Sequence, residues 1–449
     1  MSKRLILVLA FAFLVGCAVA AYAEVQNVKV SGDLNVLGVT RHFVDDKTGI
    51  ISITRVKVDA DLTDNVMTTV RLINERYWGT EIDNPNVAGK NTDIDLDLAM
   101  VTLKEFLYSP LTLTIGRQEL HFGNELIVGD SNTNNVASSA SALGTALRDP
   151  DLSARKAFDA IRATLNYDPL VIDAVYALID TNNNISDDAN DDTLLLGINA
   201  NYKVNAKNTV EGYWFERKVQ RKANDGGAGL PKKTDQTDVI GARIQSAVID
   251  NMILSAEAAY QLGKIVHVNA NEPSVDRKAW ALETAATYNF SNKKYKPSLT
   301  ALYSYFSGDH ENNDYDTTHG AFKGWDPMFE NQKSGDIANA LFNQTNAHII
   351  GGILTAQAAE DIFLKGEYYA YWWAKAFPEG AVITTVRGDG LIMTERRFVG
   401  QEVDLTATYN YTEDVQFSLM GGWLVTGPSI AKGVNKVNSE VIGSMKVTF

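Results

Sequence analysis

Apolar and polar residues alternate along most of the chain, from Val28 to the last residue, Phe449. In residues 402–411, valine, leucine, alanine and tyrosine occupy the odd positions, whereas acids, threonines and an asparagine occupy the even ones. A period of two is that of a β-strand whose two faces meet different surroundings. Residues 194–203 and 280–290 repeat this alternation, and aromatic residues stand at both ends of the apolar face of 280–290. The pattern therefore predicts an all-β chain.

The expected strands are joined alternately by short turns and by long polar connections. The short turns, most of which contain Pro, Asn or Asp, are expected at 62–65, 108–110, 167–169, 204–207, 249–251, 291–294, 358–360 and 412–414. The long connections are expected at 42–48, 79–90, 122–154, 180–192, 221–235, 264–275, 307–345, 374–393 and 426–436. Strict alternation is typical of a transmembrane antiparallel β-barrel, with tight periplasmic turns and long external loops, here of about 18 strands.

The last strand, residues 437–449, supports this interpretation. Its apolar face carries Val437, Val441, Met445, Val447 and Phe449, and its polar face carries Asn438, Glu440, Ser444, Lys446 and Thr448. A final aromatic residue on the apolar face is similar to the signal that the barrel-assembly machinery reads, so this machinery and outer-membrane lipid are the expected partners. A half-buried strand of a soluble protein would alternate in the same way. The sequence features below favour the barrel.

The N-terminus has the anatomy of a secretory signal peptide. Lys3 and Arg4 precede an apolar run at 5–15, and Ala21-Tyr22-Ala23 forms a small-x-small cleavage site before Glu24. Residues 1–23 are therefore the expected signal peptide, and residues 24–449 the expected barrel in the bacterial outer membrane. Residues 14–17 also match a lipoprotein processing box, which leaves acylation of Cys17 as the alternative. Cys17 is the only cysteine, so ordinary cleavage leaves a mature chain without disulfides.

Charged residues on the expected lumen face are the candidates for function. Arg55, Lys57, Asp59 and Asp61 alternate with apolar neighbours, as do Asp93, Asp95 and Asp97. An Arg or Lys facing mid-bilayer lipid would cost roughly 2–4 kcal/mol, so an inward position is expected for these side chains. They could set the selectivity of a pore, or form a paired network that stabilises the barrel interior, and both can hold together. The formal net charge of −14 argues against nucleic acid as a partner.

Three short motifs resemble the alginate-export outer-membrane barrel family. Residues 115–123 resemble its Gly-Arg-Gln strand, 158–162 resemble the next strand, and 400–405 resemble a late strand with a Glu-x-Asp pair. The resemblance implies an eighteen-stranded monomeric barrel with a charged lumen, which passes an anionic polysaccharide or a smaller solute passively. The lumen of the alginate exporter itself is strongly basic, whereas here acids are interleaved with the arginines.

The sequence thus predicts a passive channel for a polar or anionic solute. The candidate lumen residues along the solute path are Arg55, Arg71, Arg117, Glu119, Arg162, Arg396, Glu402 and Asp404. The alternatives are a closed barrel whose external loops bind a surface partner, and a barrel hydrolase. No enzyme, cofactor or metal is expected, because the histidines are scattered and the acidic loops lack the spacing of a calcium site. The long segments 122–154 and 307–345 could narrow the lumen or cap its mouth.

The first testable prediction concerns processing. The mature chain is expected to begin at Glu24 and to carry no lipid, because the cleavage site after Ala23 ends an apolar segment. The intact mass of protein purified from the outer membrane measures this directly. A mass that corresponds to an acylated chain beginning at Cys17 would contradict it.

Overall fold

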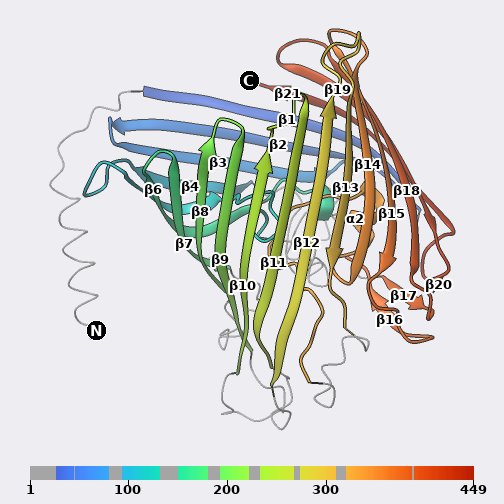
Figure 1. Cartoon of the computed structure of the whole chain (residues 1–449). Coiled ribbons are helices and arrows are strands. Elements are labelled where there is room, and N and C mark those ends of the chain that lie inside the picture. The colour runs from blue at the N-terminus through green and yellow to red at the C-terminus, as the bar shows by residue number, and fades with distance from the viewer. Residues whose placement is uncertain are drawn as a thin grey trace.

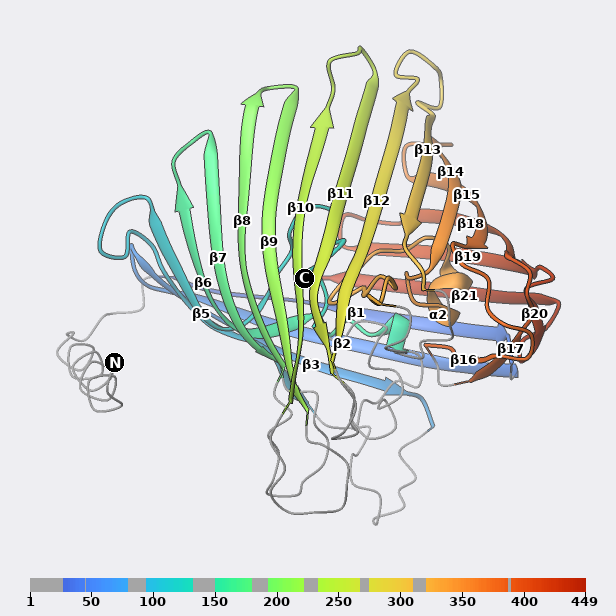
Figure 2. The same cartoon turned by 60° about the horizontal axis from the view of Figure 1, so that its bottom comes forward.

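The protein is an antiparallel β-barrel whose single large sheet closes on itself (Figures 1 and 2). The computed structural model describes residues 27–44, 46–79, 94–131, 150–179, 193–221, 233–266, 274–309, 320–386 and 389–449, and the expected signal peptide lies outside them. Eighteen strands form the barrel, and β1 pairs with β21 to close it. The expected fold and strand number are therefore confirmed. Among the described residues, no helix has both the length and the apolar character needed to span a bilayer.

The barrel strands follow one another around the wall in chain order. They are β1 (Asn27–His42), β2 (Asp46–Thr63), β3 (Val66–Tyr77), β4 (Asp95–Leu103), β5 (Leu111–Glu119), β6 (Ala157–Asn166), β7 (Leu170–Ile179), β8 (Thr193–Asn205), β9 (Asn208–Arg221), β10 (Lys233–Ser246), β11 (Met252–Ile265), β12 (Val275–Asn289), β13 (Ser298–Phe306), β14 (Ala347–Gln357), β15 (Ile362–Trp373), β18 (Phe398–Asn410), β19 (Val415–Thr426) and β21 (Val437–Thr448). Each expected short turn joins two consecutive strands of this order.

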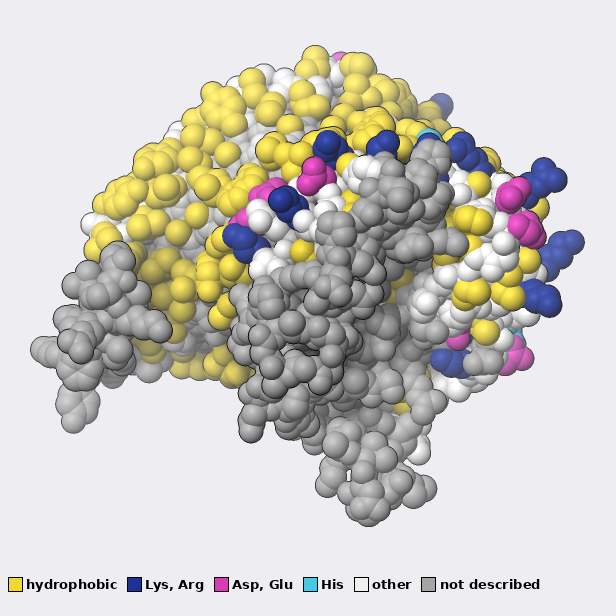
Figure 3. Space-filling view, turned by 90° about the horizontal axis from the view of Figure 1, so that it is seen from below, with side chains coloured by type: hydrophobic (Ala, Val, Ile, Leu, Met, Phe, Trp, Pro, Cys, Tyr) yellow, Lys and Arg dark blue, Asp and Glu magenta, His cyan; other side chains and the backbone are white. Residues whose placement is uncertain are grey.

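The long connections carry additional elements at the opposite end of the barrel. A separate small sheet consists of β16 (Val382–Thr384), β17 (Gly390–Met393) and β20 (Ile430–Lys432). Within the described residues, the helices are α2 (Asp336–Leu341) and the short 3-10 helix η2 (Pro150–Leu152). Seen from this end, charged side chains gather around the rim, while the adjoining outer wall is hydrophobic (Figure 3). This is the end that faces outward in a barrel with long external loops.

The expected long connection at 42–48 is wrong. β2 already begins at Asp46, which pairs with His42, and Thr48 pairs with Thr40. The connection is therefore shorter than expected. The residues here are polar because this part of the hairpin extends beyond the apolar band. Polar strand residues of this kind cannot be distinguished from a loop by their polarity alone.

The apolar face of β18 and β21 points outward and the polar face points into the barrel, as expected. On β18, Val403 and Leu405 are exposed on the outside, whereas Glu402 and Asp404 are fully buried. On β21, Val441 is exposed, while its neighbour Glu440 is buried. The exposed apolar residues form the lipid-facing surface, as the alternation predicted.

Parts of the two longest connections lie in the lumen. The residues that they bury inside the barrel are Leu120, Phe122, Leu126, Ile127, Val128, Trp325, Met328, Phe329, Ile337, Ala338, Ala340 and Leu341. The rings of Phe122 and Phe215 lie 5.4 Å apart, and those of Phe329 and Phe158 lie 5.9 Å apart. Val128 also pairs with Phe329, so the two segments contact each other as well as the wall. We call residues 120–131 and 325–341 the inward segments.

A prediction about assembly follows from the phase of β18. Leu405→Arg is expected to reduce the yield of folded barrel, because it places a charge toward lipid at a cost of roughly 2–4 kcal/mol. Thr406→Arg is the matched control, since Thr406 is half-buried on the inward face. Heat-modifiable migration of the two variants on gels measures the folded fraction. Equal yields of the two variants would show that the assigned phase of this strand is wrong.

Candidate functional site

A continuous band of polar residues crosses the inner wall from β8 to β13. In cross-strand register, each member lies directly opposite the next, in the order Asn201, Glu211, Arg243, Glu257, Glu283 and Ser304. Residues that are paired across strands share one face of a sheet. Arg243 lies 3.7 Å from Glu211 and 3.9 Å from Glu257, so one guanidinium group serves two carboxylates. We call this set the glutamate band.

The glutamate band forms one side of a cavity of about 290 Å³. The inward segments supply its other side through Asn124 and Gln332, whose side-chain amides each donate to Glu283 at 2.8 Å. Lys333 also lines this cavity. The volume is near the lower end of the range for small-molecule sites. The cavity therefore suits a small polar solute that touches both the wall and the inward segments.

A second polar band crosses the opposite part of the wall. Its members are paired in register in the order Glu367, Asp404, Gly422, Glu440 and Arg41. A Cβ atom on Gly422 would lie 2.6 Å from Oδ1 of Asp404, so a larger residue here would displace the Asp404 carboxylate. Arg41 is buried and lies 2.9 Å from Glu440 and 2.6 Å from Asp151 of η2. It thereby joins β1, β21 and the long connection that precedes β6.

The Glu-x-Asp pair of β18 fastens α2 to the wall. The carboxylate of Glu402 accepts hydrogen bonds from the backbone N–H groups of Ile337 at 2.7 Å and Ala338 at 2.9 Å. The residue at the N-cap, Gly335, has no side chain that could do this, and its φ of 88° favours glycine. Glu402 therefore satisfies donors that the first helical turn leaves free. Glu402 and Asp404 both lie inside the barrel, and Glu402 holds the first turn of α2 against the wall.

Four of the candidate residues form ion pairs on the wall between β1 and β7. Arg55 lies 2.9 Å from Asp33, and Arg162 lies 2.8 Å from Asp173. Arg71 contacts Asp97 at 2.5 Å and also pairs with Glu119. Each of these arginines has a carboxylate partner, so they do not form an unpaired cationic cluster.

The guanidinium of Arg117 lies on the outer face, against the expectation of a lumen position. In register, Arg117 lies between Ala99 and Asp159, and Asp159 is paired with Leu178. Leu178 is 51% exposed on the outside of the barrel, so its partners share that face. Arg117 and Asp159 are 3.2 Å apart near the external end of β5. The neighbouring Gln118 is the residue that points inward, and it is buried.

Arg396 is also separate from the other candidate residues. It lies in the connection between β17 and β18, and its side chain is exposed. It therefore belongs to the external end of the molecule and not to the strand wall.

Residues that the sequence interpretation did not select hold the second inward segment in place. Asp326 lies 3.1 Å from Nη1 of Arg217 and 3.4 Å from Nη2 of Arg277, which belong to β9 and β12. Burial raises the pKa of Asp326, but the two guanidinium groups outweigh burial and hold this pKa below its usual value. Both arginines occupy inward positions of the strand alternation, which is the signal that could have identified them.

Comparison with known proteins identifies the family and the fold. The sequence model of the family described as alginate export matches residues 31–444. Among solved structures, OccK11 (OpdR) of Pseudomonas aeruginosa has 11% identity and a TM-score of 0.56, over 95% of this chain and 98% of that one. OccK2 (OpdF) of the same organism, in complex with glucuronate, has 10% identity and a TM-score of 0.57, over 95% and 99%. No curated protein sequence matches significantly.

A prediction concerns the pH dependence of the inward segments. Glu330 is 3% exposed, and burial raises its pKa from 4.5 to about 8. Because the folded pKa is raised, the protonated carboxyl favours docking at low pH, and this contribution is lost as the pH rises from about 4.5 to about 8. Glu330→Gln is therefore expected to slow hydrogen exchange in residues 325–332 at about pH 9 and to change it little at about pH 5.

The exposed Glu395 provides the matched control, because Glu395→Gln is expected to leave exchange in this segment unchanged at both pH values. An effect of Glu330→Gln that is equal at both pH values would show that ionisation of this carboxyl does not weaken docking.

Proposed function

Because the chain belongs to the alginate-export family, and is a solute channel of the bacterial outer membrane and not an enzyme, we propose that its solute is small, polar and preferentially anionic. The solute moves passively down its concentration gradient. The path runs along the paired charges of the lumen wall and past the cavity at the glutamate band.

One observation carries the preference for anions. In most ion pairs of the wall, the cation is more exposed to the lumen than the acid. The exposed fractions are 30% for Arg162 against 7% for Asp173, and 44% for Lys365 against 10% for Glu367. Each such pair turns its positive end toward the lumen, which favours anions. Arg71 is an exception, since its partner Glu119 is more exposed than it is.

The inward segments limit the size of the solute. Their buried apolar cluster occupies part of the lumen, and the cavity beside the glutamate band measures about 290 Å³. A monomeric solute fits this space better than a polysaccharide chain. Two Pseudomonas aeruginosa proteins of similar fold have structures with carboxylates, OpdK with vanillate and OccK2 in complex with glucuronate. At 10% identity they carry an argument for the fold alone.

The second candidate function is a closed barrel whose external loops bind a surface partner. The observation that favours it is the same apolar cluster, because the inward segments contact each other and both sides of the wall. Conductance separates the two functions, since a closed barrel carries no current whatever its wall charges.

The prediction for the channel is measured in planar bilayers. At low salt, the unmodified protein is expected to conduct and to prefer anions. Arg162→Gln and Lys365→Gln are each expected to lower the anion-over-cation permeability ratio by roughly a factor of two, with a smaller effect at about 1 M salt. Arg117→Gln is the matched control, because it removes the same charge from the outer face and is expected to leave the ratio unchanged.

Reversal potentials under a salt gradient provide the measurement. A cation-selective pore, or an equal effect of Arg117→Gln, would contradict the proposed role of the wall charges. The absence of conductance at every voltage would favour the closed barrel.

A further inference from the structure

Aromatic rings from five neighbouring strands form a continuous row on the outer wall, toward the external end of the barrel. In order from β12 to β18, the rings belong to Trp280, Tyr305, His348, Trp372 and Phe398. The ring centroids of Tyr305 lie 4.3 Å from those of Trp280 and 4.8 Å from those of His348. His348 is paired in register with Trp372, whose ring lies 5.4 Å from that of Phe398. We call these five residues the aromatic row.

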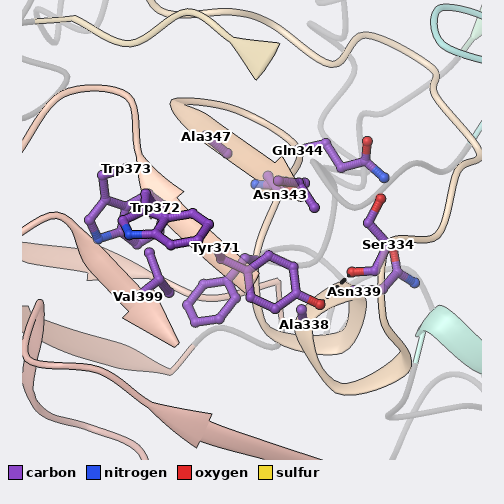
Figure 4. Close-up of a pocket in the computed structure, with 12 residues that line it drawn as sticks. Ser334, Ala338, Asn339, Asn343, Gln344, Ala347, Tyr371, Trp372, Trp373 and Val399 are labelled. Atoms are coloured by element: carbon purple, nitrogen blue, oxygen red, sulfur yellow. Dashed lines mark hydrogen bonds between the residues drawn. The ribbon is translucent and has the colours of Figure 1, made fainter. Parts of the chain in front are cut away.

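The aromatic row faces lipid and not the lumen. Trp280 is 45% exposed on the outer wall. Tyr371 and Trp373, on either side of Trp372, are instead buried toward the interior beside α2 (Figure 4). There the hydroxyl of Tyr371 donates to the carbonyl of Ser334 at 2.8 Å. Because tryptophan and tyrosine gather where a membrane meets water, the row marks the level of the outer-leaflet headgroups.

Four exposed cations border the row on its external side, namely Lys278, Lys323, Arg396 and Arg397. Lys278 lies two residues beyond Trp280 on the same face of β12, and its N–H donates to the carbonyl of the residue before Lys323 at 2.8 Å. Arg397 comes directly before β18 and is close enough to Tyr305 and His348 for its charge to act on both. Lys and Arg side chains follow this border between the hydrophobic wall and the external end (Figure 3).

These four cations differ from the cations of the lumen wall in their pairing. Arg55 and Arg162 each have a carboxylate within 3 Å, whereas none of the four forms an ion pair with an acid of the described residues. The exposed acids Asp276 and Glu395 are close in sequence but do not pair with them. Unpaired cations at headgroup level attract anionic lipid, at about fivefold in binding for each charge.

We propose that the four cations and the aromatic row bind an outer-leaflet glycolipid that carries phosphate groups on its headgroup sugars. Guanidinium and ammonium groups donate charge-assisted hydrogen bonds to phosphate oxygens. The row crosses five strands, which at about 4.8 Å per strand spacing span roughly 20 Å, so cations at its two ends need more than one phosphate. The rings below the cations pack against the first part of the acyl chains.

The lipid lies on the opposite side of the wall from the solute path. The proposal therefore does not depend on the anion preference of the lumen.

The test uses the purified full-length protein in detergent and native mass spectrometry. The probes are lipid A with two phosphates, the same lipid with both phosphates removed, and phosphatidylglycerol, which carries one. Lipid A with two phosphates is expected to be retained about fivefold or more above the dephosphorylated form, and above phosphatidylglycerol. Inorganic phosphate at millimolar concentration is expected to compete little, because it has no acyl chains to pack against the row.

Arg397→Gln and Lys278→Gln are each expected to weaken the retention of lipid A by about three- to fivefold, because each removes one cation from headgroup level. Lys104→Gln is the matched control, since it removes an exposed cation from the turn between β4 and β5, at the other end of the barrel. Its retention of lipid A is expected to equal that of the unmodified protein. Heat-modifiable gel migration first confirms that each variant folds, and if Arg397→Gln or Lys278→Gln does not, the other variant decides.

Equal retention of lipid A and its dephosphorylated form would overturn the proposal, and so would an equal loss in Lys104→Gln. Retention of phosphatidylglycerol as strong as that of lipid A would overturn the assignment to a headgroup with several phosphates. Full competition by inorganic phosphate would show an anion site without lipid specificity, which also contradicts the proposal. Conductance and ion selectivity are measured separately, so this proposal and the proposed function fail independently.

Discussion

The closure of the sheet is the constraint on which the rest of the structure depends. Hydrocarbon offers no partner for backbone N–H and C=O groups, so a strand wall in a bilayer is stable only without free edges. The pairing of β1 with β21 removes the last edge, and mutual backbone hydrogen bonds between Gly32 and Phe449, at 2.8 and 3.0 Å, complete it. Closure also fixes which face is inside. The charged residues of the alternating pattern then share one confined space, where they must find partners in one another.

The ion pairs of the lumen have two consequences at once. They orient exposed cations toward the lumen, and the pairs of Asp326 with Arg217 and Arg277 attach the second inward segment to the wall. Buried carboxylates and the guanidinium groups beside them are costly to separate. The wall charges proposed to set the selectivity of the path, such as Arg162, therefore share the inner wall with the arginines that hold the second inward segment.

The two proposed sites differ in the chemistry of their polar groups. In the glutamate band, Arg243 lies between two carboxylates and Glu283 accepts hydrogen bonds from side-chain amides, so the band suits a solute that exchanges contacts along a path. The cations above the aromatic row have no ion-pair partner among the described residues, which suits a lipid that stays bound. The two kinds of contact meet on opposite faces of β15. There Tyr371 donates to Glu402 in the interior, while the next residue, Trp372, belongs to the aromatic row.

The sequence by itself determined the strand number, the turns and the facing of β18, because a period of two is a local property of the backbone. The alternation of β5 also predicts that Arg117 faces outward, because it occupies an odd position like Leu113 and Ile115. The resemblance of this strand to the family motif had instead suggested a lumen position. Only the tertiary structure decided the partners of the charges, the docking of the inward segments and the assembly of the aromatic row. Arg41 and Glu440, for example, are 399 residues apart in sequence. Such contacts depend on closure of the barrel, which no local pattern encodes.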